Sequence, residues 1–158
     1  MQEITFLFSA IILLMLPHSG QSEEIANDSQ GKEASSVSDS RQLVSMPDET
    51  RMIMRDEMLS HLSALNEIIG FLANNNLDAA ANVAETKLGK SSMGKHRATG
   101  KGPGRFMPLE MRNIGWSMHE SATKLSQAAK DGDLKGAYGA LQRITSSCVA
   151  CHYSYRTQ

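Results

Sequence analysis

The sequence predicts an all-α protein, an antiparallel up-down-up-down bundle of four helices. Aromatic residues make up only 5% of the 158 residues and prolines number four, a composition that favours helices over sheets. Apolar residues recur at spacings of three and four in four helix-length segments, which two short turns and one long loop join. Because short connections make successive helices antiparallel neighbours, the up-down-up-down order is expected.

The first residues are predicted to be removed from the mature protein. Residues 4–16 form an apolar run that Pro17 ends. The run is too short to span a bilayer comfortably but has the length typical of a signal peptide. Gly20 and Ser22 supply the small residues needed for cleavage before Glu23.

This prediction has one alternative. The segment before the apolar run lacks Lys and Arg and contains Glu3, so it could instead be an uncleaved N-terminal anchor. We predict a signal peptide over residues 1–22 and a disordered linker over residues 23–44, which are polar and nearly free of large apolar side chains. The bundle domain is expected over residues 45–158.

The first two helices are predicted between Ser45 and Gly89. Ser45 is the expected N-cap of the first helix, with Pro47 in its first turn, and three asparagines from Asn74 stop it. The second helix is expected over residues 77–88, ended by Gly89. The stripe expected to face the core in the first helix is Met54, Met58, Leu62, Leu65, Ile69 and Leu72.

The third and fourth helices follow a long basic loop. The loop, residues 89–106, is rich in glycine, carries Lys90, Lys95, Arg97, Lys101 and Arg105, and contains no acidic residue. The third helix is expected over residues 108–131, with Met111, Ile114, Met118, Leu125 and Ala129 on one face. Asp133 is the expected N-cap of the fourth helix, whose core stripe is Leu134, Ala137, Leu141, Ile144, Cys148 and Cys151.

The motif with the most specific chemistry is Cys148-Val149-Ala150-Cys151-His152, which holds the only two cysteines of the chain. On a helix the two thiols lie one turn apart on one face. They can therefore form thioethers with the two neighbouring vinyl groups of a haem, while the adjacent imidazole of His152 binds the iron. The motif predicts covalently bound haem c near one end of the bundle. Such haem is attached outside the cytoplasm, in agreement with export to the periplasm.

Other interpretations of the two cysteines fit less well. A thioredoxin-type redox pair needs a βαβ context, which the helical pattern does not provide. A structural zinc site needs four ligands, and no second pair of cysteines or histidines is spaced to complete one. A disulfide between residues three apart on a helix would be strained and would close almost no loop.

The sixth ligand of the iron is expected from the first two turns of the first helix, which share an end of the bundle with His152. Methionine thioether is a soft ligand that raises the reduction potential. Met54 is the preferred candidate. The sequence leaves open Met58, Met52, a vacant position, and the histidines His61, His96 and His119, and methionines at this spacing are also ordinary core residues.

The chain resembles the cytochrome c′ and cytochrome c-556 family, the class II c-type cytochromes, over about residues 47–156. The resemblance rests on Cys148-Val149-Ala150-Cys151-His152-Tyr153-Ser154-Tyr155-Arg156 and on Ile53-Met54-Arg55-Asp56. It implies that Cys148 and Cys151 bind haem, that His152 and Met54 are axial ligands, and that Arg156 lies against the proximal face or a propionate. Arg156 could equally be a surface arginine. The basic loop is longer than the family leads us to expect.

Two functions follow from these expectations. One is electron transfer through haem with histidine and methionine ligands. The other is binding of NO or CO at an open distal face, as the resemblance to cytochrome c′ implies. A helical bundle without a cofactor is a third alternative, but it would leave the only two cysteines unexplained.

The sequence also predicts which functions and partners to expect. No arrangement of catalytic residues is recognisable, so no enzyme is predicted. The net charge of −1 gives no general attraction to nucleic acid, and no membrane association is expected after signal cleavage. An acidic redox partner could dock at the basic loop Lys90–Arg105. The family resemblance and an apolar surface on the first two helices also suggest a homodimer.

Overall fold

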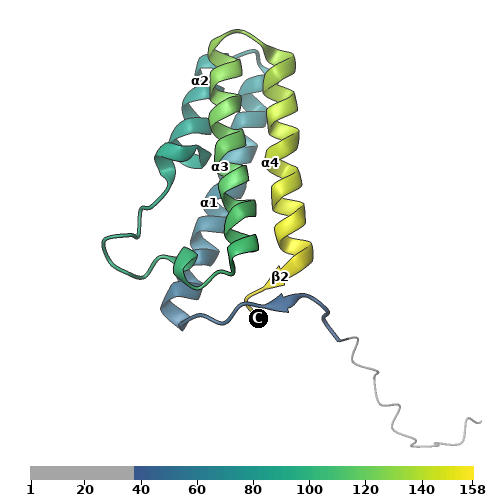
Figure 1. Ribbon diagram of the computed structural model, residues 1–158. Helices are drawn as coiled ribbons and strands as arrows, with labels where there is room; N and C mark the ends of the chain where they lie inside the picture. Colours follow the sequence, from purple (N-terminus) through teal and green to yellow (C-terminus); the bar gives the residue numbers. More distant parts are fainter. Residues whose placement is uncertain (1–37) are drawn as a thin grey trace, which may run out of the picture. The chain divides into compact units, whose positions relative to one another are not determined.

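The computed structural model describes residues 38–158, so the predicted signal peptide and most of the predicted linker lie outside the described residues. Its helices are α1 (Asp48–Ala73), α2 (Leu77–Val83), α3 (Leu109–Lys130) and α4 (Leu134–Ser154). Shorter elements are the π-helical turn η1 (Ala84–Leu88), the 3-10 turns η2 (Lys90–Ser92) and η3 (Pro103–Arg105), and the strands β1 (Gln42–Leu43) and β2 (Tyr155–Arg156). Figure 1 shows this arrangement. The prediction of a mostly helical protein with four main helices is confirmed.

The main core is built largely from small side chains. Alanine has the highest helix propensity, and its short side chain lets neighbouring helix backbones approach closely. Larger residues fill the space between these alanines, with Ile68, Leu88, Leu125 and Ile144 the largest that are fully buried. The buried alanines of this core are Ala64 on α1, Ala80 on α2, Ala84 on η1, Ala122 on α3, and Ala137 and Ala140 on α4.

The start of α1 differs from the prediction. The helix begins at Asp48, and Pro47 occupies the N-cap position with no side-chain hydrogen bond to the first turn. The expected cap, Ser45, lies outside the helix. A proline disfavours helical geometry in the residue before it, so Met46 is a poor first helical residue and Ser45 does not become the cap.

The face of α1 that meets the core also differs from the prediction. Met54 and Leu72 are buried as expected, but Leu62 and Ile69 are 65% and 50% exposed. Ala64 and Ile68 face the core instead. α1 carries apolar residues on two faces, and each face shows a spacing of three and four. The pattern alone therefore predicted a buried face that is partly wrong.

The end of the predicted linker is structured. Gln42 and Leu43 of β1 pair in parallel with Tyr155 and Arg156 of β2, and the Val44 amide donates a hydrogen bond of 2.8 Å to the Arg156 carbonyl. The compact unit begins at residue 38 rather than 45. The prediction of a disordered linker is therefore wrong for residues 38–44, because the backbone pairing with β2 was not visible in their polar composition.

The other helix boundaries agree closely with the prediction. The segment from Leu77 to Leu88 is helical, with its last turn in π geometry. Asp133 caps α4, accepting a hydrogen bond of 2.8 Å from the Gly136 amide. Gly132 has a φ of +75°, a left-handed conformation that glycine adopts at little cost. Among the described residues, no helix is both long and apolar enough to cross a membrane.

Replacing Val44 tests whether the segment before α1 is part of the folded domain. Val44 is 3% exposed and packs in a small cluster with Met54 and Met111. We expect V44A to lower the free energy of unfolding by about 1–2 kcal/mol, because it removes buried methyl groups and leaves a cavity. The neighbouring Leu43 is 47% exposed, so L43A is the control and should change stability by less than about 0.5 kcal/mol. Equal effects of the two changes in urea denaturation would contradict the packing described here.

Candidate functional site

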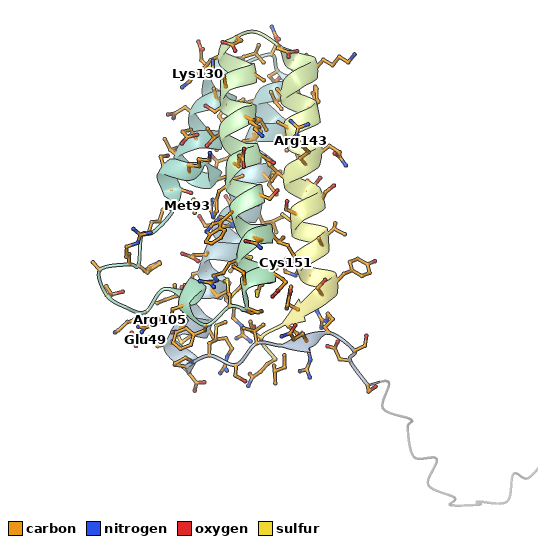
Figure 2. The ribbon with its side chains drawn as sticks, viewed as in Figure 1. Glu49, Met93, Arg105, Lys130, Arg143 and Cys151 are labelled. Atoms are coloured by element: carbon orange, nitrogen blue, oxygen red, sulfur yellow. The ribbon has the colours of Figure 1, made fainter. Side chains whose placement is uncertain are left out.

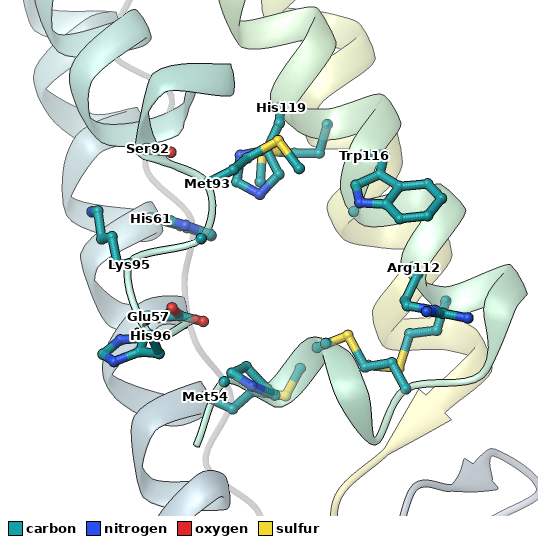
Figure 3. Close-up of a pocket in the computed structure, with 18 of the residues that line it drawn as sticks. Met54, Glu57, His61, Ser92, Met93, Lys95, His96, Arg112, Trp116 and His119 are labelled. Carbon is teal, nitrogen blue, oxygen red and sulfur yellow. Dashed lines mark ion pairs between the residues drawn. The ribbon is translucent and has the colours of Figure 1, made fainter. Parts of the chain in front are cut away.

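A cavity of about 580 Å³ opens between α1, α3, α4 and the loop before α3. This volume lies within the range of small-molecule and cofactor sites, which is about 300–1,000 Å³. Figure 3 shows side chains from α1 and the loop on one side of the cavity and side chains from α3 on the other. Its lining includes Met54, Met58 and His61 of α1, Met93, His96 and Met107 of the loop, Met111, Arg112, Trp116, Met118 and His119 of α3, and Cys148 and Cys151 of α4.

Both cysteines line the cavity from α4. They are half-buried and are not joined by a disulfide. Cys148 packs at the edge of the main core, while Cys151 packs against the small cluster of Val44, Met54 and Met111. Burial raises the pKa of both thiols, and the neighbouring Cys148 raises that of Cys151 further. The two thiols therefore stay protonated at neutral pH and sit where one group in the cavity can contact both.

His152 lies in the last turn of α4, directly after Cys151. Its side chain is exposed and is not among those that line the cavity. The segment before α1 approaches its backbone, since Arg41 Nη1 lies 3.4 Å from the His152 carbonyl oxygen, to which it donates a hydrogen bond. The structure thus places the imidazole beside the cysteines but at the outer side of α4.

Six methionines line the cavity. Met54 is 8% exposed and belongs to the cluster that contacts Cys151. Met58 lines the cavity one turn further along α1, whereas Met52 is 63% exposed and does not line it. The structure therefore brings two of the three methionines considered as iron ligands to the cavity. Thioether side chains from the loop and α3 complete this lining: Met93, Met107, Met111 and Met118.

His61 and His119, which the sequence left open as ligand candidates, both line the cavity. The rings of His61 and His119 are 5.9 Å apart between centroids and meet edge to face. His119 Nδ1 lies 2.7 Å from the Leu88 carbonyl oxygen. Burial lowers the pKa of His61 to about 4, with smaller contributions from His119 and Lys95. The sequence did not predict this contact between His61 and His119, because it joins residues far apart along the chain.

Arg156 has a different neighbour from the one the resemblance implies. Its Nε lies 3.6 Å from an Asp39 carboxylate oxygen, and that nitrogen is buried without a hydrogen bond. Hydrogen bonds from Arg41 hold the pKa of Asp39 down to about 2, and the charge of Arg156 adds to the effect. Arg156 is not among the residues that line the cavity. In this structure it fixes the segment before α1 to β2.

The basic loop forms a wall of the cavity and is tied to the helices on both sides. The Lys101 ammonium pairs with Glu49 of α1 at 2.5 Å, and His96 lies 3.4 Å from Glu57. At the other side, the Lys90 amide donates a hydrogen bond of 3.0 Å to Thr123 Oγ1 of α3. The loop thus bridges α1 and α3 beside the cavity, as the sequence led us to expect of a loop near the same end as Cys151.

The buried His61 predicts a pH dependence of stability in the haem-free protein. The folded state depresses the pKa of His61 from 6.5 to about 4, so the unfolded state binds the proton more readily between these values. Stability should then fall as the pH drops from 7.5 to 5, by about 1 kcal/mol after allowing for partial exposure. In urea denaturation, H61Q should lose this dependence and the control H96Q should keep it. If the free energy of unfolding changed equally with pH in H61Q and in the parent chain, His61 would be excluded as the source of the pH dependence.

The chemistry of the cavity lining matches a haem. It offers two thiols one turn apart, thioether donors, apolar surface and a buried arginine nitrogen that has no hydrogen-bond partner. Zinc is a poorer match, since no group of three His, Cys, Asp or Glu side chains within residues 38–158 is arranged to hold a metal ion.

The comparison with protein families agrees with this chemistry. The family model described as cytochrome C′ matches residues 108–156, a range that contains α3, α4 and β2 and both cysteines. No curated protein and no solved structure gives a significant match. Over residues 108–156 the chain is similar to the cytochrome c′ family, in agreement with the resemblance that its Cys148–His152 motif indicates.

Proposed function

We propose that the chain is an exported, periplasmic c-type cytochrome that carries single electrons through a covalently attached haem c. The observation that carries the proposal is that both cysteines of the motif open into one cavity, which is lined by methionine side chains. The helices would form the antiparallel up-down-up-down bundle expected from their short connections. The family match supports a c-type cytochrome.

In this proposal each site residue has a specific task. Cys148 and Cys151 would hold the group through thioethers, His152 would supply the proximal nitrogen, and Met54 would supply the sulfur of the sixth ligand. Haem c supplies an iron centre that can exist as Fe(II) or Fe(III). Met54, packed against Val44, Met111 and Cys151, would stay in place between the two states, whereas the exposed side chain of His152 would have to turn into the cavity to bind the iron.

Gas binding is the second candidate function. The observation that favours it is the packing of Met54, which already contacts Val44, Met111 and Cys151 in a cluster of its own. If Met54 stayed in this cluster, apolar side chains and His61 would line the distal side of the cavity, and no methionine would bind the iron there. In either case we propose a carrier or binding protein rather than an enzyme.

The absorption spectrum of the mature protein, expressed with haem-attachment machinery, separates the two functions. If methionine fills the sixth position, the reduced protein should show the sharp bands of low-spin haem and no response to CO. A broad high-spin spectrum that shifts with CO would instead favour gas binding. Complete absence of haem bands would overturn the proposal.

Single methionine replacements then identify the ligand. We expect M54A to convert the low-spin spectrum to a high-spin one that responds to CO, because only a small apolar side chain remains at that position. M58A should keep the low-spin spectrum. M52A is the matched control on the same helix, since Met52 is largely exposed. A high-spin spectrum in M58A together with an unchanged M54A would assign the ligand to Met58.

We also propose that the basic loop receives an acidic redox partner. Lys90, Lys95, Lys101 and Arg105 carry its charge beside the cavity that would hold the haem. Opposite charges on two proteins speed their encounter, and salt weakens the effect. Figure 2 shows Arg105 near Glu49 at the start of α1, on the same side of the domain as the loop.

Neutralising these four residues together to glutamine tests the partner site. Reduction by an anionic donor at low salt should slow about tenfold or more, because steering contributes 10–10³-fold to such rates. The control replaces four exposed lysines elsewhere with the same change in net charge: Lys87, Lys124, Lys130 and Lys135. Reduction of this control should slow much less. An uncharged donor should reduce the parent chain and both variants at the same rate. Equal slowing in both variants would reject the loop as the docking site.

A further inference from the structure

We propose that Arg112 binds a carboxylate of the haem, so that the acidic edge of the group lies against α3. This inference rests on the proposed function and adds a binding residue to it. The vinyl groups and the propionates of haem occupy opposite edges of the ring. With the vinyl edge bonded to cysteines on α4, the carboxylates would lie at the edge of the ring farthest from these cysteines, within reach of cavity residues on α1, α3 and the loop.

Arg112 is the cavity residue whose hydrogen bonds are incomplete. Its Nε is buried and has no hydrogen-bond partner. Within residues 38–158 no carboxylate lies within ion-pair distance of its guanidinium. A buried donor without a partner is unfavourable, and one that carries charge is more so. The arrangement is therefore that of a residue whose partner is an anion held in the cavity.

The orientation of Arg112 is set by its own helix. The guanidinium lies 5.9 Å from the centre of the Trp116 ring, one turn further along α3, in cation–π contact. Figure 3 shows both side chains on the α3 side of the cavity, across from Met54, Glu57 and His61. A guanidinium held by its aromatic neighbour is prepared for a two-pronged hydrogen bond to a carboxylate, for which its geometry is well suited.

The other cationic residues of the cavity are less suited to this task. Lys95, Arg97 and Arg105 line it from the loop and are exposed. Arg105 Nη1 already donates to the Gly100 carbonyl at 2.7 Å. Exposed cations gain little from pairing with an anion, because water competes for both groups. Arg112 is the cavity cation with a buried nitrogen that lacks a partner.

Binding of haem and of its dimethyl ester measures the carboxylate contact directly. The ester has the same ring and the same vinyl groups but no charged edge. In the full chain carrying C148A and C151A, attachment is not covalent and binding can be titrated by absorbance. With Arg112 present, haem should bind about 10- to 100-fold more tightly than the ester, as expected for a charge-assisted hydrogen bond.

Variants of Arg112 decide between a binding role and a structural one. R112M should lose the preference for haem over the ester, and R112K should keep part of it. The control R143M changes an exposed arginine of α4 that does not line this cavity (Figure 2) and should keep the full preference. The proposal would be overturned if R112M kept the full preference for haem over the ester. It would also be overturned if the chain with Arg112 showed no such preference. A general loss of stability would weaken binding of both compounds equally and leave the preference intact.

The mature cytochrome provides a second readout that does not depend on reversible binding. There, R112M should have a lower reduction potential than R143M, because an uncompensated carboxylate stabilises Fe(III). If the non-covalent form binds neither haem nor its dimethyl ester, the reduction potentials decide. Equal reduction potentials in R112M and R143M would then overturn the proposal. Failure of the parent chain to acquire haem in the cell would overturn the proposed function itself, so the two failures are distinguishable.

Discussion

The structure depends on a difference in side-chain size between two parts of the bundle. In the main core, alanines from α1, α2, α3 and α4 let the helices pack closely. Beside the cysteines, α1 carries methionine and histidine and α3 carries methionine, histidine and arginine, and a cavity of about 580 Å³ remains between these helices and α4. Close packing in the main core holds the helices in place. The helices therefore do not close the space beside the cysteines. The cavity is thus a consequence of where the small residues are placed along each helix.

The region around the cavity needs stabilisation of its own, and two connections provide it. The basic loop joins α1 to α3 through Lys101 with Glu49 and through Lys90 with Thr123. The segment before α1 pairs with β2 directly after the cysteine motif, and Val44 fills the space between Met54 and Met111. Both connections join parts of the chain that are distant in sequence. They fix the ends of α1 and α4, which carry the residues proposed to contact the haem.

The sequence predicted what depends on local patterns and missed what depends on distant pairs. Helix boundaries in α3 and α4 were predicted well, because caps and glycines such as Asp133 and Gly132 act within a few residues. The two cysteines were placed correctly on the inner side of α4 by helical periodicity alone. The β1–β2 pairing, the His61–His119 contact and the Asp39–Arg156 ion pair were not predicted. Each joins segments whose proximity arises only from the complete fold, and none has a sequence motif.

The two candidate functions differ in whether a donor atom of α1 fills the sixth position of the iron, and the cavity offers two kinds of donor. These are the thioethers of Met54 and Met58 and the imidazole of His61, which its low pKa keeps neutral at physiological pH. A sulfur ligand favours Fe(II), whereas an imidazole ligand gives a lower potential. Arg112 would affect the same balance between Fe(II) and Fe(III). Its pairing with a propionate would compensate a negative charge that otherwise favours Fe(III). Two turns of α1, from Met54 to His61, and one arginine of α3 would therefore set both the ligand and the potential of the site.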